Sequence, residues 1–302
     1  MADYDVVVIG AGPGGLSAAL NLVRARRRTL ILDGNRPRNA ATLLAHGYLG
    51  RDSISPLELR KIGRDEIAAY PDAEFQLATV SSVTFAGREF RVEANGVRGS
   101  ADRSVTARAI VIATGIIETL PSFAGIRAFY GTSLHSCIEC DGYEERDKPL
   151  ALIGETDDLA EHAQLLSQWT DDLIVFTNGI GAISEPEESA LAAKGIRIER
   201  RPIDDVVGGR GGLTGVLLQD GTVIERSGGF LRPIYTPSLG FVDELTLDTD
   251  DNGFLVVDGA GRTSIEGVYA AGDSTSPGPQ QLIVAAGAGA KTAAAVNRDL
   301  LT

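Results

Sequence analysis

The chain has 302 residues, of which 43% are hydrophobic, and its formal net charge is −13. This length allows two domains with buried cores, whereas the acidic balance argues against a nucleic-acid partner, which would require a basic face. No apolar run approaches the roughly 18 residues of a membrane-spanning helix, and no secretory leader is visible, so we expect a cytoplasmic protein without a membrane partner.

The first predicted element is a buried β-strand, Tyr4 to Ile9, which runs into a glycine-rich turn and then a helix from Leu16 to Arg24. The turn has the spacing GxGxxG and consists of Gly10, Ala11, Gly12, Pro13, Gly14 and Gly15. Its three motif glycines permit, in chain order, a tight bend, the approach of a pyrophosphate to the helix N-terminus, and close packing of helix on strand. A second strand, Thr29 to Leu32, ends at Asp33, which is placed to accept a ribose hydroxyl. The N-terminal segment therefore predicts a dinucleotide-binding site.

A loop, a helix and a small sheet are predicted between this site and the cysteines. Residues 36–39 are predicted to form an ordinary surface loop. A helix is predicted from Pro56 to Tyr70, with an imperfect apolar stripe formed by Leu57, Leu59, Ile62, Ile67 and Ala68. Short alternating runs between Glu74 and Ala107 predict an antiparallel meander. A buried strand that starts at Ala109 then ends in the small-residue turn Ala113-Thr114-Gly115.

The only two cysteines, Cys137 and Cys140, form a CxxC motif, and this is where we expect the chemistry. A bridge across so small a loop removes little chain entropy, so a purely stabilising disulfide is the weaker interpretation. A zinc site would require further ligands, but there is no second CxxC and the only histidines are His46, His135 and His162. No metal site is therefore predicted, and a redox-active dithiol is favoured. Asp141 and His135 are the nearby groups that could assist thiol deprotonation, although His135 could equally be an ordinary loop histidine.

A second strand-and-glycine unit repeats the N-terminal pattern. Leu150 to Gly154 corresponds to the first strand and its first glycine, with an offset of 144 residues between Gly10 and Gly154. The same offset pairs Gly12 with Thr156, Gly15 with Leu159, and Asp33 with Thr177. These pairs predict a second Rossmann-like unit that has lost its phosphate-binding glycines and its ribose carboxylate.

The charges of this second unit also argue against a nucleotide. Residues 149–193 contain no Lys or Arg, and three acids, Glu155, Asp157 and Asp158, follow the glycine. An adenosine 2′-phosphate would need a basic partner after the second strand, where the chain has only Phe176-Thr177-Asn178-Gly179. The sequence therefore argues against NAD(P)H as a cofactor.

The C-terminal part is predicted to return to the first domain. A buried strand that starts at Gly267 ends at Gly272 and Asp273, and an Ala-rich helix is predicted from Gln280 to Asn297, after Pro277. An acid at the end of a strand and beside the start of a helix can hydrogen-bond a ribitol hydroxyl of a flavin. Together with the N-terminal fingerprint, this pattern predicts the second half of a flavin site.

The chain contains four motifs in this order: Gly10 to Gly15, Ala113-Thr114-Gly115, Cys137 to Gly142, and Gly272-Asp273 followed by Gln281 and Ala285-Ala286-Gly287. Over essentially its whole length the sequence therefore resembles the low-molecular-weight thioredoxin reductase family of flavoproteins. The resemblance implies an α/β fold with two Rossmann-like, three-layer ββα domains, the second inserted into the first. It implies an FAD-binding domain over residues 1–115 and 236–302, an inserted NAD(P)-type domain over residues 116–235 that carries the CxxC, and a homodimer.

The resemblance also implies roles for individual residues. Cys140 would lie nearer the flavin C4a, Cys137 would exchange with the substrate, and Asp141 would be the acid that protonates a thiolate or its partner. Beyond the first glycine turn and Asp33, the cofactor-binding residues that the motifs imply are Ala113, Thr114, Gly115, Gly272, Asp273, Gln281 and Leu282.

Departures from the family pattern leave the direction of electron flow open. NADPH-using members keep the second glycine motif and a basic cluster, and the surroundings of the CxxC here also resemble those of flavin-dependent dithiol oxidases, which oxygen reoxidises. Those oxidases typically carry His where this chain has Asp141. We therefore expect an FAD-dependent thiol–disulfide oxidoreductase that acts on a thioredoxin-like protein or a small-molecule dithiol or disulfide, with oxygen, ferredoxin or a flavin as the other electron partner. The alternatives are an NADPH-dependent thioredoxin reductase with an altered nucleotide pose and a non-catalytic redox-sensing module.

Overall fold

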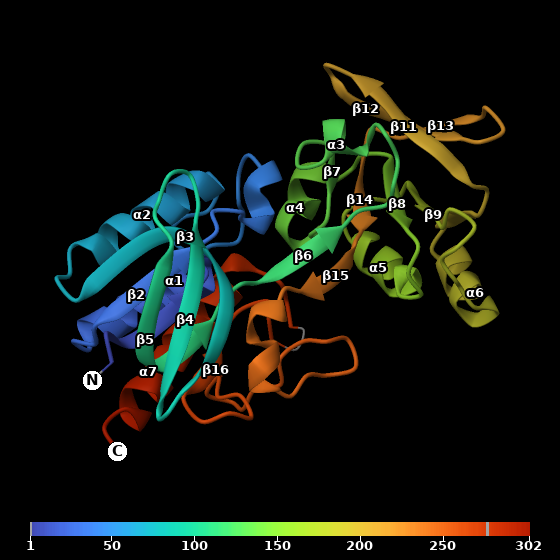
Figure 1. Cartoon of the computed structure of the whole chain (residues 1–302). Helices are drawn as coiled ribbons and strands as arrows, with labels where there is room; N and C mark the ends of the chain where they lie inside the picture. Colours follow the sequence, from blue (N-terminus) through green and yellow to red (C-terminus); the bar gives the residue numbers. More distant parts are fainter. Residues whose placement is uncertain (1, 276–277) are drawn as a thin grey trace. The chain divides into compact units, whose positions relative to one another are not determined.

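The computed structural model describes residues 2–275 and 278–302, and both Met1 and the Pro277 expected before the last helix lie outside this part of the chain. The protein folds as two compact units (Figure 1). The first consists of Met1–Ala40, Gly47–Ile117 and Thr236–Thr302, and the second of Ala41–His46 and Glu118–Tyr235. Each unit contains a parallel sheet of Rossmann type, so the predicted α/β class with one unit inserted into the other is confirmed. The binding of FAD by the first unit stays a prediction.

The first unit is built on a six-stranded sheet. Its strands are β1 (Tyr4–Ile9), β2 (Thr29–Asp33), β3 (Ala73–Ala86), β4 (Glu89–Gly96), β5 (Arg103–Ile112) and β16 (Val268–Ala270). Strand β1 lies between β2 and β5, and the pairs β3–β2, β2–β1, β1–β5 and β5–β16 are all parallel. The unit is completed by the helices α1 (Pro13–Arg24), α2 (Pro56–Ala68) and α7 (Leu282–Asp299) and by the short 3-10 helices η1 (Arg38–Ala41) and η2 (Gly240–Leu245).

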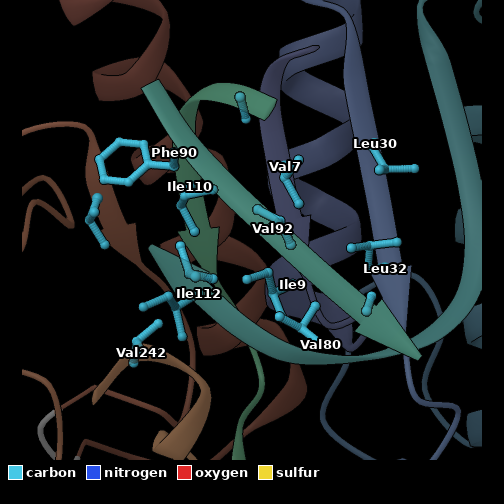
Figure 2. Packing of buried hydrophobic residues seen from close by; sticks show 14 of the residues in the cluster. Val7, Ile9, Leu30, Leu32, Val80, Phe90, Val92, Ile110, Ile112 and Val242 are labelled. Carbon is cyan, nitrogen blue, oxygen red and sulfur yellow. The ribbon is translucent and has the colours of Figure 1, made fainter. Parts of the chain in front are cut away.

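The side chains of β1 alternate between two buried layers. Val7 and Ile9 pack in a layer with Val92 of β4, as Figure 2 shows. Val6 and Val8 pack in the opposite layer, which contains residues of α1 and α7. A parallel strand that is buried on both faces must be apolar at every position, and this is why the sequence reads as a continuous β-branched run.

The predicted meander between Glu74 and Ala107 forms, but it is part of the main sheet. Strands β3–β4 and β4–β5 pair antiparallel. The first five residues of β3, Ala73 to Leu77, pair parallel with β2, and the end of β5 pairs parallel with β1. The two outer strands of the meander are therefore longer than predicted, because each one leaves its antiparallel partner and continues into the parallel sheet.

Helix α2 departs from its predicted apolar stripe. Leu57 is 70% exposed, whereas Arg60 is buried and its Nη2 lies 2.8 Å from Asp33 Oδ2. Of the predicted stripe, only Ile67 is buried. The prediction that Leu57 is buried is wrong, because the ion pair between Arg60 and Asp33 turns Arg60 toward the interior instead. Hydrophobic periodicity cannot reveal such a pair.

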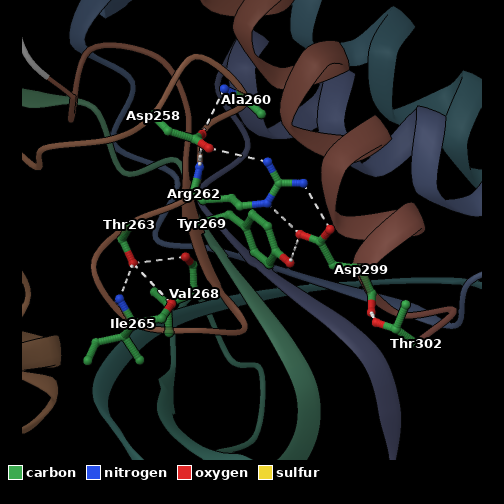
Figure 3. Close-up of polar contacts among 9 residues, drawn as sticks. All are labelled: Asp258, Ala260, Arg262, Thr263, Ile265, Val268, Tyr269, Asp299 and Thr302. Atoms are coloured by element: carbon green, nitrogen blue, oxygen red, sulfur yellow. Dashed lines mark hydrogen bonds and ion pairs between the residues drawn. The ribbon is translucent and has the colours of Figure 1, made fainter.

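The end of the chain is fastened to the sheet by a polar cluster (Figure 3). Arg262 donates from Nε and Nη2 to the two carboxylate oxygens of Asp299, at 2.7 and 2.8 Å. The Tyr269 hydroxyl of β16 donates to the same carboxylate at 2.8 Å. This bidentate pair holds the last turn of α7 beside β16. Helix α7 begins and ends two residues later than predicted, and the strand before it is limited to β16.

The second unit repeats this plan with a parallel sheet in the order β10-β9-β8-β14-β7. Its strands are β7 (Leu134–His135), β8 (Leu150–Gly154), β9 (Leu173–Phe176), β10 (Arg197–Glu199) and β14 (Gly228–Arg232). An antiparallel sheet joins β11 (Ile203–Gly209), β12 (Gly212–Leu218) and β13 (Val223–Glu225), and the helices are α3 (Ile126–Phe129), α4 (Ile138–Glu145), α5 (Leu159–Leu166) and α6 (Glu185–Ala193). The strands β6 (Ile116–Thr119) and β15 (Ile234–Pro237) pair where the chain passes from one unit to the other. The predicted repeat at Leu150 is thus confirmed.

Two glycines of α7 allow a matched test of helix packing. A Cβ added at Gly289 would lie 2.0 Å from the carbonyl oxygen of Gly14 in α1, whereas one added at Gly287 would meet no described atom within 4 Å. We expect Gly289→Ala to lower the free energy of unfolding by about 1–3 kcal/mol, because the two helices must separate.

The control, Gly287→Ala, is expected to raise the free energy of unfolding by roughly 0.5–1 kcal/mol, since alanine is the better helix former. Urea denaturation of the two variants beside the parent protein measures both changes. Equal effects of the two substitutions would contradict the close contact between α1 and α7.

Candidate functional site

The two cysteines lie at the start of α4. Cys137 occupies the position just before the helix, in an extended conformation, and forms a disulfide with Cys140 across a Cα–Cα distance of 5.2 Å. Both residues are half-buried. The amide of Asp141 donates to the carbonyl of Cys137 at 3.2 Å, which closes the first turn. A cysteine at a helix N-terminus is stabilised as a thiolate by the backbone amides and the helix dipole, so this placement suits thiol–disulfide exchange.

The structure brings His135 and Asp141, both proposed from the sequence, into one buried cluster. His135 ends β7, and its Nδ1 lies 3.4 Å from Asp141 Oδ1. Its other ring nitrogen, Nε2, lies 3.8 Å from Oε1 of Glu145, on the next turn of α4. The ring of Phe230 in β14 packs 5.8 Å away, centroid to centroid. His135 is thus a buried residue at the end of β7, and the interpretation as an ordinary loop histidine is wrong.

The charges around His135 favour its protonated form. Burial would lower the pKa of His135, but the facing carboxylates of Asp141 and Glu145 raise it to about 9. Burial would raise the pKa of Glu145, yet His135 and Lys148 hold it below its usual range. Lys148 Nζ lies 2.9 Å from Glu145 Oε1. The cluster therefore combines two cations and two anions in the segment that carries the disulfide.

Sequence reasoning missed Glu145 and a second polar group beside the cysteines. Glu145 follows Asp141 by four residues, so the two share one helix face, and this spacing was the available signal. The second group surrounds Ser136, the residue before Cys137. Ser136 Oγ donates to Glu118 Oε1 at 3.0 Å, and the Tyr130 hydroxyl donates to Glu118 Oε2 at 2.5 Å. No local sequence pattern connects these three residues, because they come from three separate segments.

In the first unit, the glycine turn has the geometry that its motif predicts. Gly10 adopts φ +103°, and a Cβ there would lie 2.3 Å from the carbonyl oxygen of Ala113. A Cβ at Gly15 would lie 1.9 Å from the carbonyl oxygen of Gly10, so helix and strand pack closely there. A Cβ at Gly12 would meet no described atom within 4 Å. Gly10 and Gly15 are therefore required by the fold, whereas Gly12 leaves open space at the start of α1.

That open space is part of a cavity lined by every cofactor-binding residue predicted from the sequence except Gly15. These residues are Gly10, Gly12, Pro13, Gly14, Asp33, Ala113, Thr114, Gly115, Gly272, Asp273, Gln281 and Leu282. They come from the carboxyl ends of β1, β2, β5 and β16 and from the starts of α1 and α7. The topology thus places four distant sequence segments at one edge of the sheet, which is where nucleotides bind in folds of this type.

The cavity also has walls that the sequence did not predict. Arg36, Pro37, Arg38 and Asn39, interpreted as an ordinary loop, line it together with Arg60. Arg38 Nη2 lies 3.1 Å from Asp273 Oδ2, and Asp33 pairs with Arg60. Thr114 Oγ1 is buried without a hydrogen-bond partner among the described residues. An orphan hydroxyl, free space at Gly12 and arginines near the start of a helix together fit a dinucleotide such as FAD.

The corresponding turn of the second unit is different. Its glycine, Gly154, does not adopt the left-handed φ of Gly10. Leu159, at the position of Gly15, is fully buried, and its side-chain methyls would lie 2.7 Å from a Cβ at either Gly154 or Gly181. The side chain of Leu159 therefore occupies the gap between the strand and the following loop, where the first unit has only backbone.

Acidic residues of this second turn are engaged within the protein. Asp158 Oδ2 accepts from Nε and Nη2 of Arg232 at 2.8 and 2.5 Å, and its Oδ1 accepts from Thr156 at 2.6 Å. Glu155 accepts a hydrogen bond from Asn178 at 2.7 Å. Asn178 follows Thr177, the residue that corresponds to Asp33. Burial would raise the pKa of Asp158, but Arg232 and Thr156 keep it below its usual range. The turn thus presents carboxylates where a phosphate would need amides.

Two arginines follow β10, but each one contacts carboxylates. Arg200 Nη2 lies 2.6 Å from Glu188 Oε2. Arg201 lies 2.6 Å from Glu199 and 2.8 Å from Asp220. These pairs are exposed and individually weak, but they direct both guanidinium groups toward acids of the protein.

Comparison with known proteins assigns the family. The family model of the pyridine nucleotide-disulphide oxidoreductases matches residues 4–289. The chain belongs to this family. A thioredoxin reductase of Aquifex aeolicus is 30% identical over 98% of this chain and 93% of its own length. A match with a protein of Arthroderma benhamiae, 32% identical over 58% of this chain, spans 44% of that protein. The crystal structure of TrxB from Bacillus anthracis matches with a TM-score of 0.91 and 37% identity, over 99% of this chain and 98% of the other.

These findings confirm the resemblance drawn from the four motifs: the protein is an enzyme of the thioredoxin reductase-like flavoprotein oxidoreductases. Across residues 2–275 and 278–302, this oxidoreductase has no helix long and apolar enough to cross a membrane. In the same part of the chain, no group of three or more His, Cys, Asp and Glu side chains is arranged to hold a metal ion.

Gly12 allows a test of the cavity that leaves the fold intact. We expect Gly12→Val to weaken FAD binding by at least about tenfold, because the new side chain enters the space that the pyrophosphate would occupy. The unfolding of the apoprotein should not change, since no described atom lies within 4 Å of the added Cβ. FAD titration followed by fluorescence and urea denaturation measure the two quantities. Gly209→Val, at an exposed glycine with equal free space, is the control; unaltered FAD affinity in Gly12→Val would contradict the assignment.

His135 should make the stability of the oxidoreductase pH-dependent. Because the pKa of His135 in the folded protein, about 9, exceeds its ordinary value of 6.5, the His135 charge stabilises the fold fully below about pH 6.5, and this contribution is lost as the pH rises through 9. The difference in unfolding free energy between the parent and His135→Gln should therefore shrink by on the order of 2–3 kcal/mol over that range. Urea denaturation at a series of pH values measures it, and a constant difference would contradict a charged His135.

Proposed function

We propose that this protein is an FAD-dependent dithiol–disulfide oxidoreductase that does not use NAD(P)H as its electron donor. Cys137 and Cys140 exchange electrons with a substrate dithiol or disulfide, and oxygen or a donor such as ferredoxin or a free flavin is the other electron partner. The observation that carries this proposal is the second nucleotide-type turn, which Leu159 and the Asp158–Arg232 pair fill from within.

The argument against NAD(P)H is steric and electrostatic. A pyrophosphate needs backbone amides at a helix N-terminus and glycines that let it approach them. In the second unit, Leu159 replaces the glycine that lets helix and strand pack closely, and the carboxylates of Glu155 and Asp158 repel a second anion. Arg232 could neutralise a phosphate only after leaving Asp158, and Asp158 would then remain without its partner.

The thiol chemistry follows from the disulfide at the start of α4. In the oxidative direction, a substrate thiolate attacks Sγ of Cys137, the Cys137–Cys140 bond breaks, and Cys140 leaves as a thiolate. The second substrate thiolate then attacks the substrate sulfur of the mixed disulfide and releases Cys137. Two electrons pass from the substrate to the enzyme dithiol, and the two protons of the substrate thiols are taken up by the cysteines or by solvent. The reverse sequence reduces a substrate disulfide.

The groups around the dithiol stabilise the thiolates of this exchange. Cys137 lies at the N-terminus of α4, a position that favours a thiolate, and His135 and Asp141 are titratable groups within two residues of a cysteine in the sequence. When bound in the first unit, FAD supplies a two-electron redox partner for the dithiol. Thr114, Arg38 and the amides around Gly12 are the residues that would hold it there.

Similarity to the thioredoxin reductases supports the remaining parts of the proposal. A thioredoxin-like protein or a small-molecule dithiol or disulfide is the substrate, and the enzyme acts as a cytoplasmic homodimer. The alternative, an NADPH-dependent thioredoxin reductase with an altered nucleotide pose, is favoured by the match to the pyridine nucleotide-disulphide oxidoreductase family and by the relatives named thioredoxin reductase. The two functions differ in the electron donor, so one kinetic experiment separates them.

Anaerobic stopped-flow reduction of the FAD-loaded protein tests the proposal. We expect a dithiol such as dithiothreitol to bleach the flavin absorbance, and NADPH or NADH at micromolar concentration to do so at least about a hundredfold more slowly, since the second turn offers a pyrophosphate no amide cradle. Rapid bleaching by NADPH would contradict the proposal and support the thioredoxin reductase alternative.

The matched control is Cys140→Ser, which keeps the first unit unchanged. It should retain bound FAD and lose the bleaching by dithiols, because no enzyme disulfide can form. If this variant is still reduced by dithiols at the parental rate, the flavin reacts with thiols directly and the assigned role of the CxxC is wrong.

A further inference from the structure

One buried acid of α4, the helix that follows Cys137, has no role in the exchange chemistry described above. Glu145 lies on the last turn of α4, and its Oε2 is buried without a hydrogen-bond partner among the described residues. Its Oε1 lies 2.9 Å from Lys148 Nζ and 3.8 Å from His135 Nε2. A buried carboxylate that is incompletely satisfied is costly, so its presence calls for a functional reason.

The fold makes room for this carboxylate. Strand β14 begins at Gly228, and a Cβ at this position would lie 2.2 Å from Glu145 Oε2 and 3.3 Å from a methyl of Leu150. The missing side chain at Gly228 therefore leaves the space that the carboxylate occupies. Any larger residue there would push Glu145 away from His135.

The arrangement selects the charge state of His135. Each ring nitrogen faces one carboxylate of α4, Asp141 at Nδ1 and Glu145 at Nε2. Only the imidazolium carries a proton on both nitrogens, whereas the neutral ring would turn a lone pair toward one of the two anions. From β14 the ring is covered by Phe230, which is uncharged, and Lys148 forms its ion pair with Glu145. In the part of the chain that the structure describes, the charged groups that face the imidazole are therefore the anions Asp141 and Glu145.

We propose that Glu145 is a positioning residue for the dithiol: together with Asp141 it holds His135 as an imidazolium two residues before Cys137. This inference rests on the proposed thiol exchange. The fixed cation favours the thiolate form of the reduced cysteines, so Glu145 acts on the sulfur atoms only through His135. Asp141 alone would face one nitrogen and leave the other without a facing carboxylate.

The protein contains only three histidines, so the state of His135 can be measured directly. The FAD-loaded, oxidised protein labelled with 13C at histidine Cε1 gives three resonances, and His135→Gln identifies the one that belongs to His135. Titration between about pH 5 and about pH 10 should show His135 with its midpoint near 9, and Glu145→Gln should lower that midpoint by about one unit or more.

Glu144→Gln is the matched control. It removes the same charge from the same helix, but Glu144 is half-exposed and faces His46 at 3.7 Å. This control should leave the His135 midpoint unchanged. Glu145→Asp, which keeps the charge, should restore at least part of the shift that Glu145→Gln removes. A purely structural role for Glu145 would produce no such dependence on charge.

A second measurement links the cluster to the cysteines. After anaerobic reduction, the pH profile of alkylation by iodoacetamide reports thiolate formation. Glu145→Gln should move the profile to higher pH, with about a threefold or greater loss of rate near neutral pH, and Glu144→Gln should not.

The outcomes decide the proposal even if Glu145→Gln does not fold. A midpoint at or below 6.5 for His135 in the parent protein would overturn it, as would a His135 midpoint and an alkylation profile that Glu145→Gln leaves unchanged. Neither measurement involves NADPH. Rapid reduction by NADPH would thus refute the proposed electron source and leave this inference standing, whereas a neutral His135 would refute the inference alone.

Discussion

Both units depend on a parallel sheet whose central strands are buried on both faces. Parallel pairing places Ile9 opposite both Leu32 and Ile112, so neighbouring strands end at the same level. The turns that follow must then pass close to one another, and Gly10 is the position where a side chain would collide with the backbone of Ala113. Two of the three motif glycines are thus demanded by the packing of strand, helix and neighbouring turn. The remaining one, Gly12, is the glycine whose identity only a ligand can explain.

The features that the sequence predicted are those encoded by contiguous residues. The strands, the first glycine turn and the CxxC each lie within one short segment, and their patterns depend on local geometry or on burial of both sheet faces. The features that it missed join segments far apart in the chain. Arg60 is buried because Asp33, 27 residues earlier, faces it. Glu145 of α4 is buried because His135 of β7 faces it and Gly228 of β14 leaves space for its carboxylate. Such contacts leave no hydrophobic periodicity, since charged residues at these positions are predicted to be solvent-exposed. For Glu145 the one local signal is its spacing of four residues from Asp141.

The second unit keeps the same framework but fills its glycine turn with side chains. Replacing a glycine by Leu159 converts the space next to the turn into core, and burying a leucine side chain contributes roughly 1.5–3 kcal/mol. The Asp158–Arg232 pair closes the remaining polar side of the turn. A phosphate-binding turn normally leaves several amides for its ligand to satisfy, so it is stable mainly when loaded. At the Gly154 turn, the side chain of Leu159 occupies this space.

Net charge and local charge act differently in this protein. The chain as a whole carries −13, yet in the segment that carries the disulfide the buried carboxylates of Asp141 and Glu145 face His135, and Lys148, whose side chain is 42% exposed, pairs with Glu145. Exposed acids interact through water and salt, which screen charges beyond about 8–10 Å, whereas buried groups in contact are screened far less. The thiols therefore respond mainly to the buried cluster and to the first turn of α4. An acidic protein can stabilise a thiolate for this reason: the charges that matter to sulfur are the few from which water is excluded.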